Sequence, residues 1–242
     1  KITSFFEKKL FKIGIDYSEV LFKEEPHLDK DFLKIASNVN KIYKNNAFNT
    51  TNYTAYSVTK NIINQNIPGC IVECGVYQGQ KISVILETLK LLKSFNRNIY
   101  LIDTFEGMTE PSDIDYQVIA GNKMKKKDMF CSLDQVKKNI FFSDYPSDKI
   151  IFNKIDVRDT VELKNKINET ISILWLDTDF YDSTYSILNA FYDKVEKNGY
   201  LIHDDYGHWK GHYEACQKFY LENSIKPVLI RTSRKERLEI KS

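Results

Sequence analysis

Two pairs of acidic residues, each at the end of a short apolar run, are the residues of this sequence best suited to chemistry. The pairs are Asp177 with Asp179 and Asp204 with Asp205. Carboxylate ligands suit Mg²⁺, Mn²⁺ or Ca²⁺, and zinc is not expected because no cysteine–histidine cluster accompanies them. Without a cation, neighbouring carboxylates would repel and raise one another's pKa. We therefore expect Asp177, Asp204 and Asp205 to hold a divalent cation.

Short apolar runs separated by helical patterns must position these acids. The expected strands cover residues 71–74, 98–103, 149–152, 171–176, 199–202, 227–231 and 237–240. The expected helices cover residues 81–93, 133–142, 160–167, 183–195 and 212–223, with Ser183 as a helix cap. This alternation predicts an α/β fold with a mostly parallel seven-stranded sheet, helices on both faces and a C-terminal antiparallel hairpin.

The carboxyl ends of parallel strands lie along one edge of a sheet, and ligands bind outside that edge. Asp103 closes the second expected strand and Glu73 lies in the first, so both should join the two acid pairs there. An acid after the second strand is where α/β nucleotide folds bind ribose hydroxyls. The sequence therefore predicts one binding site, at the edge where these acids meet.

A glycine turn follows the first expected strand. Gly75 and Gly79 stand four residues apart, before the helix that begins near Lys81. Glycine lets a turn approach a ligand closely, and a helix amino terminus offers unpaired N–H groups. The spacing differs from the Gly-x-Gly-x-x-Gly fingerprint of dinucleotide-binding folds. The alternative is a purely structural turn between strand and helix.

Composition argues against several functional classes. The 242 residues are 42% hydrophobic, which suffices for one domain with a full core. A net charge of +2 and a pI near 8.2 give no strong field, so we expect no binding to nucleic acid. No apolar stretch approaches the ~20 residues that span a bilayer, so no membrane insertion is expected. Four scattered cysteines without metal-binding spacing indicate a reducing, cytoplasmic location.

Two segments lie outside the alternating pattern. Residues 1–65 have apolar residues at helical spacing and should form an N-terminal helical cap or lid on a core of residues 66–242. Within this cap we expect a loop from Asn45 to Tyr56. Residues 104–130 are rich in turn residues and then in lysine, which is typical of a lid or substrate loop above the strand ends.

Four ordered motifs resemble the macrocin O-methyltransferase (TylF-like) family of metal-dependent, S-adenosylmethionine-dependent sugar O-methyltransferases. They lie at residues 67–76, 103–111, 176–184 and 204–209, and the resemblance runs from about Thr50 to the C-terminus. The first motif begins the Glu-x-Gly-x-x-x-Gly turn of class I methyltransferases, which have a Rossmann-like fold. The sequence departs from the family pattern at Tyr77, Gln78, Gln80 and Ile155.

The resemblance implies roles for particular residues. It places S-adenosylmethionine on Glu73, Cys74, Gly75, Val76, Tyr77, Gly79, Asp103, Thr104, Phe105, Asp156 and Val157. It assigns Mg²⁺ or Mn²⁺ to Asp177, Asp204 and Asp205, and the role of general base to Asp179. The residues expected to contact the sugar are Glu106, Met108, Tyr181, Tyr206 and His208. A homodimer is also expected.

The sequence thus predicts a Mg²⁺-dependent O-methyltransferase that acts on a sugar hydroxyl. The expected acceptor is a nucleotide-linked sugar, or a precursor of a surface polysaccharide (capsule or LPS) or of a natural-product glycan. One alternative takes Asp177 to Asp179 as the Asp-x-Asp motif of a glycosyltransferase, or of a phosphotransferase that forms an aspartyl-phosphate. In such a phosphotransferase the acid pair should follow the first core strand, whereas here it follows the fourth expected strand. A non-catalytic sugar-binding module would use the same fold without needing the acids.

Overall fold

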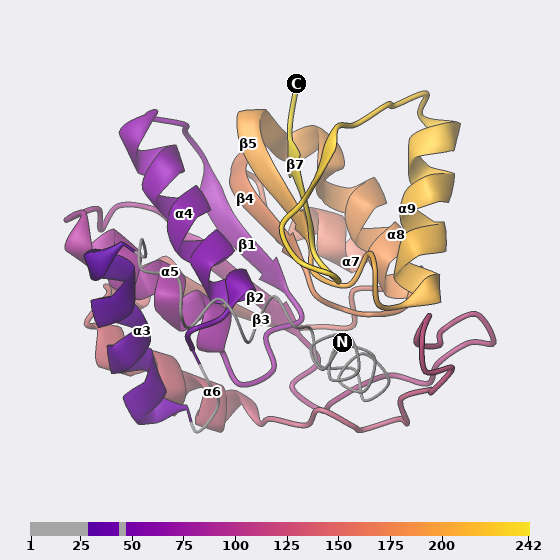
Figure 1. Cartoon of the computed structure of the whole chain (residues 1–242), viewed down its shortest axis with the longest axis horizontal. Helices are drawn as coiled ribbons and strands as arrows, with labels where there is room; N and C mark the ends of the chain where they lie inside the picture. The colour runs from indigo at the N-terminus through magenta and orange to yellow at the C-terminus, as the bar shows by residue number, and fades with distance from the viewer. Residues whose placement is uncertain (1–28, 44–46) are drawn as a thin grey trace, which may run out of the picture.

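In residues 29–43 and 47–242, which the computed structural model describes, seven strands form one mixed sheet (Figure 1). The strands are β1 (Cys70–Cys74), β2 (Ile99–Asp103), β3 (Ile150–Lys154), β4 (Ile171–Leu176), β5 (Val195–His203), β6 (Leu229–Arg231) and β7 (Arg237–Ile240). Their order across the sheet is β3-β2-β1-β4-β5-β7-β6. Strands β1 to β5 are parallel, and β7 runs antiparallel to both of its neighbours. The predicted fold class is confirmed.

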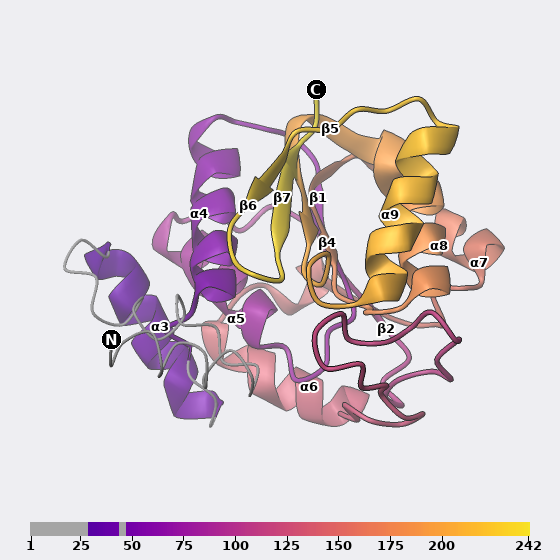
Figure 2. The same cartoon turned by 45° about the vertical axis from the view of Figure 1, so that its right-hand side comes forward.

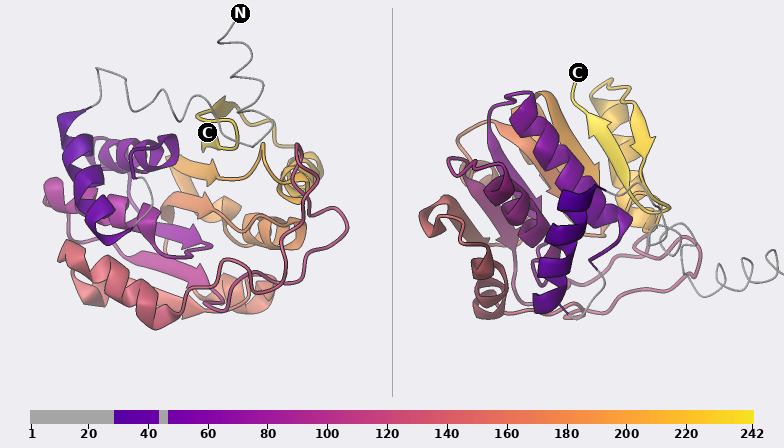
Figure 3. Two further views of the ribbon diagram at one scale, coloured as in Figure 1. Left: turned by 60° about the horizontal axis from the view of Figure 1, so that its bottom comes forward. Right: turned by 60° about the vertical axis from the view of Figure 1, so that its left-hand side comes forward.

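Helices cover both faces of this sheet (Figure 1, Figure 3). One face is covered by α3 (Lys30–Ile42), α4 (Thr50–Asn64), α5 (Gln80–Leu91) and α6 (Leu133–Ile140). The other face is covered by α7 (Thr160–Asn165), α8 (Tyr181–Phe191) and α9 (Lys210–Glu222). None of the helices in the described ranges is both long enough and apolar enough to cross a bilayer.

Alternating side chains of the central strands divide the core into two halves. In β4, Ile173 and Trp175 pack on the side of α3 to α6, whereas Leu174 and Leu176 pack on the side of α7 to α9. Successive residues of a strand point to opposite faces, so a strand covered on both faces is apolar throughout. This burial explains why β4 reads as one continuous apolar run.

The expected loop from Asn45 to Tyr56 is wrong in its second half, because α4 begins at Thr50. Asn49 caps this helix by accepting a hydrogen bond from the Asn52 N–H at 2.8 Å. The Thr54 hydroxyl donates to the Thr50 carbonyl at 3.1 Å. Asparagine and threonine, which favour turns in isolation, thus serve here as a cap and as helix-internal donors. The part of the expected cap at residues 1–28 lies outside the described residues.

The prediction that Ser183 caps a helix is also wrong. Helix α8 already begins at Tyr181, and Ser183 lies in its first turn. The Ser183 hydroxyl donates to the carbonyls of Thr178 and Phe180 at 3.1 and 3.0 Å. The helix ends at Phe191 rather than near residue 195, because β5 begins at Val195.

Helices α3 and α4 belong to the same hydrophobic core as the sheet. Phe32 of α3 and Ile62 of α4 are fully buried in the cluster that also contains β4 residues. Asp29, the residue that caps α3, accepts hydrogen bonds from Tyr56 Oη at 2.7 Å and from Lys60 Nζ at 2.8 Å. These contacts bind α3 to α4 and so fix the described part of the expected cap on the core.

Residues 104–130 form neither helix nor strand, apart from one isolated bridge between Gln117 and Trp209. The Val118 N–H donates to the His208 carbonyl at 2.9 Å, and the Tyr181 N–H donates to the Asp115 carboxylate at 2.8 Å. Figure 2 shows this segment beneath the carboxyl ends of the strands and the start of α9. The expected irregular segment is therefore present, and it is bonded to the segments that follow β4 and β5.

Candidate functional site

A cavity of about 510 Å³ opens at the carboxyl ends of the central strands. Its lining includes Asp177, Asp179, Asp204 and Asp205. The first two follow β4 and the other two follow β5, and these strands are parallel neighbours in the sheet. The fold therefore brings the two acid pairs into one cavity, beside the glycine turn after β1.

The glycine turn passes close to the end of β4. Gly75 has a φ of +86°, and a Cβ at this position would lie 1.8 Å from the carbonyl oxygen of Asp177. The Asp177 N–H in turn donates to the Cys74 carbonyl at 2.9 Å. Only glycine satisfies both the left-handed φ and the lack of space. The turn and the first acid pair are consequently held in fixed register.

Replacing Gly75 by alanine is expected to lower the free energy of unfolding by about 3 kcal/mol or more, since left-handed strain and overpacking add. Gly121→Ala is the matched control, because Gly121 has a φ of +67° with open space around it. The control should cost only about 1–2 kcal/mol. Chemical denaturation of both variants measures the difference. Equal losses would show that contact with Asp177 is unimportant.

Asp103, at the end of β2, faces the cavity and also holds the glycine turn. Its Oδ2 accepts hydrogen bonds from the N–H groups of Val76 at 2.7 Å and Tyr77 at 3.2 Å. Its Oδ1 accepts from the Phe105 N–H at 2.8 Å. Oδ1 also accepts a long bond from the Thr104 hydroxyl at 3.4 Å, and this weakest of its four bonds is the one that a ligand hydroxyl could replace. Asp103 thus holds the glycine turn in position and also faces the cavity.

Three carboxylates form a compact cluster within the cavity. Single oxygens of Asp177, Asp179 and Asp205 all lie within 4.8 Å of one another. Asp179 has a φ of +61°, which is uncommon for a residue other than glycine. Strained backbone of this kind is concentrated at functional sites, where the surrounding structure holds it in place.

Burial and mutual repulsion disfavour the ionised forms of these acids. Burial raises the pKa of Asp179 to about 6, and the neighbouring Asp177 adds to the shift. The pKa values of Asp177 and Asp205 are also raised, by burial and by the acids beside them. Glu73, buried behind the cluster, has its pKa raised to about 8 by burial, against the effect of Lys81. A cation in the cavity would reverse these shifts.

Two lysines partly neutralise the acids. Lys81, in the first turn of α5, forms an ion pair with Asp177 and lies 3.5 Å from Glu73 Oε1. Lys235, in the hairpin between β6 and β7, lies 2.5 Å from Asp204 Oδ2. Although burial opposes it, Lys235 and then Lys81 hold the pKa of Asp204 well below its usual range. Asp204 is therefore ionised, with its charge compensated within the protein.

The donor set fits a hard divalent cation such as Mg²⁺ or Mn²⁺. Asp177, Asp179 and Asp205 offer three converging carboxylate oxygens, and Asp205 Oδ2 is buried with no hydrogen-bond partner in the described part of the chain. Asp204, one of the three expected ligands, differs because its Oδ1 accepts from Trp175 Nε1 at 3.3 Å while its Oδ2 binds Lys235. Geometry thus places Asp179 in the cluster and Asp204 beside it.

Other residues predicted for the cofactor divide into two groups. Val76, Tyr77, Thr104, Asp156 and Val157 line the cavity, as Gly75 and Asp103 do. Glu73, Cys74 and Phe105 are buried behind it, and Gly79 precedes α5 as its left-handed cap residue. The second group can support the turn but does not face the cavity.

The residues expected to contact a sugar also fall into two groups, those that line the cavity and those that do not. Met108 and His208 line the cavity. The side chain of Glu106 pairs with Lys154 at 2.8 Å and is 68% exposed. The ring of Tyr181 stacks on Tyr185, and that of Tyr206 packs edge-on against Tyr213. Glu106, Tyr181 and Tyr206 do not line the cavity in this conformation.

Sequence reasoning missed both lysines of the site. A signal existed for Lys81, because a cation in the first turn of a helix opposes the helix dipole and needs a partner. No comparable signal existed for Lys235, which reaches Asp204 only because β7 inserts between β5 and β6. Trp209, the last residue of the fourth motif, lines the cavity and packs edge-on against Phe180, a position that the motif alone does not indicate.

Comparison with known proteins identifies a matching family and several relatives. Residues 54–234 match the family model described as macrocin O-methyltransferase (TylF). The chain is 28% identical over 152 residues to demethyldecarbamoylnovobiocin O-methyltransferase of Streptomyces niveus, covering 61% of this chain and 56% of the relative. It is 25% identical over 158 residues to 8-demethyl-8-(2,3-dimethoxy-α-L-rhamnosyl)-tetracenomycin-C 4′-O-methyltransferase of Streptomyces olivaceus, covering 64% and 58%.

The chain thus spans a little over half the length of these curated relatives. Among solved structures, it is similar to the O-methyltransferase NovP, with a TM-score of 0.72, 23% identity and 80% of each chain covered. At this identity the structural similarity concerns the fold, which is the Rossmann-like fold of class I methyltransferases.

Proposed function

Because the chain belongs to the macrocin O-methyltransferase family, we propose that it transfers a methyl group from S-adenosylmethionine to a sugar hydroxyl with the help of a divalent cation. One observation carries the proposal: three carboxylates within 4.8 Å of one another share a cavity with the glycine turn. The turn would hold the methyl donor while the carboxylates would hold the cation and take up the proton.

Bound S-adenosylmethionine supplies a methyl group on a sulfonium, and a bound Mg²⁺ or Mn²⁺ supplies a Lewis acid that orients the acceptor hydroxyl. The chain's own residues do the rest. Asp179 would accept the proton of the acceptor hydroxyl, whose oxygen would receive the methyl group and leave S-adenosylhomocysteine. Asp177, Asp204 and Asp205 are the proposed metal ligands, and Asp204 would join the other two with the cation in place of Lys235 Nζ at its Oδ2. Residues 104–130 would exclude water from the cavity.

For the cofactor, we propose that the methionine portion lies over residues 73–79, that Asp103 binds the ribose and that the adenine lies near Asp156 and Val157. The lining of the cavity by Gly75, Asp103 and Asp156 supports this path. Asp156 is held by Arg158 at 2.6 Å, which would fix the wall on the adenine side.

Replacing Asp103 by alanine should weaken the binding of S-adenosylhomocysteine by about 1.5–3 kcal/mol, the scale for hydrogen bonds to a charged group. Calorimetric titration of protein stripped of endogenous cofactor measures this loss. Asp148→Ala, at an exposed acid away from the cavity, is the control and should bind normally. Unchanged affinity in Asp103→Ala would place the ribose elsewhere.

The proposed acceptor is a nucleotide-linked sugar, or a precursor of a surface polysaccharide or natural-product glycan. Support comes from the name of the relative from Streptomyces olivaceus, which specifies a rhamnosyl group. A screen of nucleotide-linked hexoses, deoxysugars and heptoses with Mg²⁺ and S-adenosylmethionine tests the acceptor class. Met108 and His208, which line the cavity, are the proposed sugar contacts. A cytoplasmic homodimer stays a prediction.

The competing functions differ in what they require of the acids. An aspartyl-phosphate phosphotransferase needs the pair after its first core strand, whereas Asp177 and Asp179 follow β4. Neither a glycosyltransferase nor a sugar-binding module needs the glycine turn to bind S-adenosylmethionine. Binding of S-adenosylmethionine therefore distinguishes the proposed methyltransferase from a glycosyltransferase and from a sugar-binding module. Methyl transfer distinguishes it from a module that binds without catalysis.

A further inference from the structure

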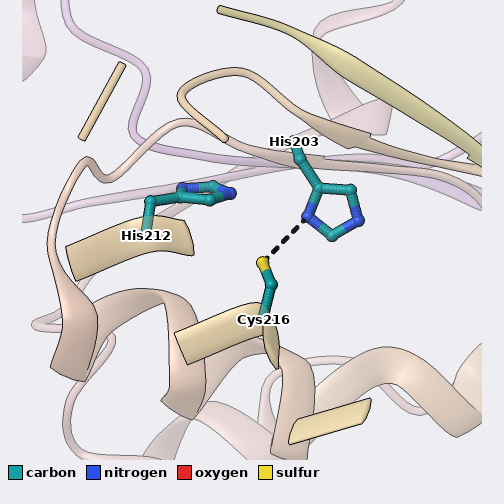
Figure 4. A group of neighbouring side chains, drawn as sticks. All are labelled: His203, His212 and Cys216. Atoms are coloured by element: carbon teal, nitrogen blue, oxygen red, sulfur yellow. Dashed lines mark hydrogen bonds between the residues drawn. The ribbon is translucent and has the colours of Figure 1, made fainter. Parts of the chain in front are cut away.

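Three side chains that the proposed reaction does not use meet in the interior between β5 and α9 (Figure 4). His203 is the last residue of β5, and His212 and Cys216 stand four residues apart on one face of α9. All three are completely buried. One ligand atom from each lies within 4.8 Å of the other two. Figure 4 shows the two rings and the thiol pointing toward a common centre.

The histidines present their inner nitrogens to this centre and bond their outer nitrogens elsewhere. His203 Nδ1 lies 3.5 Å from Cys216 Sγ, while its Nε2 lies 3.0 Å from Tyr220 Oη and 3.5 Å from Glu239 Oε2. His212 Nδ1 lies 3.2 Å from Thr184 Oγ1. His212 Nε2 is buried and has no hydrogen-bond partner within the described ranges. Metal-binding histidines are commonly oriented in this way by a second partner on the outer nitrogen.

The charges nearby favour a divalent ion. Glu239 is 2% exposed, and it accepts hydrogen bonds from Tyr192 at 2.7 Å and Tyr220 at 2.5 Å. A buried charge needs compensation. The net charge of a divalent cation, a Cys216 thiolate and the Glu239 carboxylate is zero. A monovalent cation would leave a net charge of −1.

We propose that His203, His212 and Cys216 bind a zinc ion that ties the end of β5 to α9. Two imidazoles and a thiolate are ligands that zinc prefers, in contrast to the all-oxygen set in the cavity. With zinc bonds of about 2.0–2.1 Å to nitrogen and 2.3 Å to sulfur, a tetrahedral site separates these atoms by about 3.5 Å. The distance from His203 Nδ1 to Cys216 Sγ is 3.5 Å.

This site would bear on the cavity, because His203 directly precedes Asp204 and Asp205. Fixing His203 to α9 would fix the end of β5 and thus the backbone that carries both acids. Spacing alone did not mark the site, since one ligand lies on a strand and the other two lie on the following helix.

The test measures metal content and spectrum rather than activity. Protein purified from zinc-supplemented cells and dialysed against excess Mg²⁺ should retain about one zinc per chain. Reconstitution with Co²⁺ should give a sulfur-to-cobalt charge-transfer band in the near ultraviolet. Cys216→Ala should lose both signals. Cys70→Ala, which removes another buried free thiol, should keep both, and so should Asp177→Asn, which alters the carboxylate cluster.

Thermal unfolding of the native protein gives a second measurement that does not depend on whether Cys216→Ala folds. Saturating zinc should raise the unfolding midpoint of metal-stripped native protein by about 5 °C or more. Zinc content well below stoichiometric, with neither a cobalt band nor a shift in the midpoint, would overturn the proposal. Equal zinc content in the native protein and Cys216→Ala would also overturn it, because the ion would then lie elsewhere.

Discussion

Replacing Asp205 by alanine is expected to abolish metal-dependent turnover, with a fall of about 10³-fold or more. The Lewis acid is worth several kcal/mol to the transition state, and each 1.4 kcal/mol is a factor of ten. Asp205 is 3% exposed, and its Oδ2 has no hydrogen-bond partner in the described ranges, so this oxygen is available to a cation. Initial rates across a range of Mg²⁺ concentrations measure the effect.

Asp193→Ala is the control for this experiment, because Asp193 is exposed and does not line the cavity. The control should retain native turnover and native dependence on Mg²⁺. Excess Mg²⁺ should fail to rescue Asp205→Ala, since the ligand itself is missing. Native rates in Asp205→Ala would contradict its assignment as a metal ligand.

Replacing Asp179 by asparagine should reduce turnover by about 10²–10⁴-fold while leaving metal and cofactor affinity nearly unchanged. Asparagine keeps the size of the side chain, and it also tolerates the left-handed backbone, where Asp179 has a φ of +61°. The loss should therefore report the missing base rather than a rearranged turn. Single-turnover rates, with calorimetry for the two affinities, separate chemistry from binding.

Asp177→Asn is the comparison that separates base from ligand, and it should weaken metal binding directly. The pH–rate profile of the native protein should rise as the base loses its proton, and this limb should be absent in Asp179→Asn. Asp177 and Asp179 both belong to the three-carboxylate cluster, so either residue is close enough to the other two acids to serve as the ligand. Loss of the metal in Asp179→Asn, with metal retained in Asp177→Asn, would exchange the two roles.

Much of the architecture was predictable because periodicity reports burial directly. Strand β4 is covered on both faces and reads as an unbroken apolar run, and Gly75 marks the turn where a side chain has no space. The acids at strand ends were predicted to converge because parallel topology leaves one edge for them. The start of α4 was missed because its cap, Asn49, also suits a loop.

The details of the site were less predictable, because they depend on side chains from distant segments. The bonds from Asp103 to the glycine turn depend on the position of β2 beside β1. The pairing of Asp204 with Lys235 depends on the insertion of β7 into the sheet. The backbone strain at Asp179 leaves no pattern in composition or spacing. The sequence thus identified the two acid pairs and Asp103 at the cavity, whereas Glu73 is buried behind the cluster and the individual partners of the acids required the structure.

The most direct measurement is transfer of a labelled methyl group from S-adenosylmethionine to a sugar acceptor by chelator-treated protein, with and without added Mg²⁺. The account predicts background transfer in EDTA and repeated turnover on addition of Mg²⁺, with the label recovered as a methyl ether on a sugar oxygen. Equal transfer in EDTA would contradict the role of the carboxylate cluster. Failure to methylate any nucleotide-linked sugar or glycan precursor, by protein that binds S-adenosylhomocysteine, would contradict the proposed acceptor class.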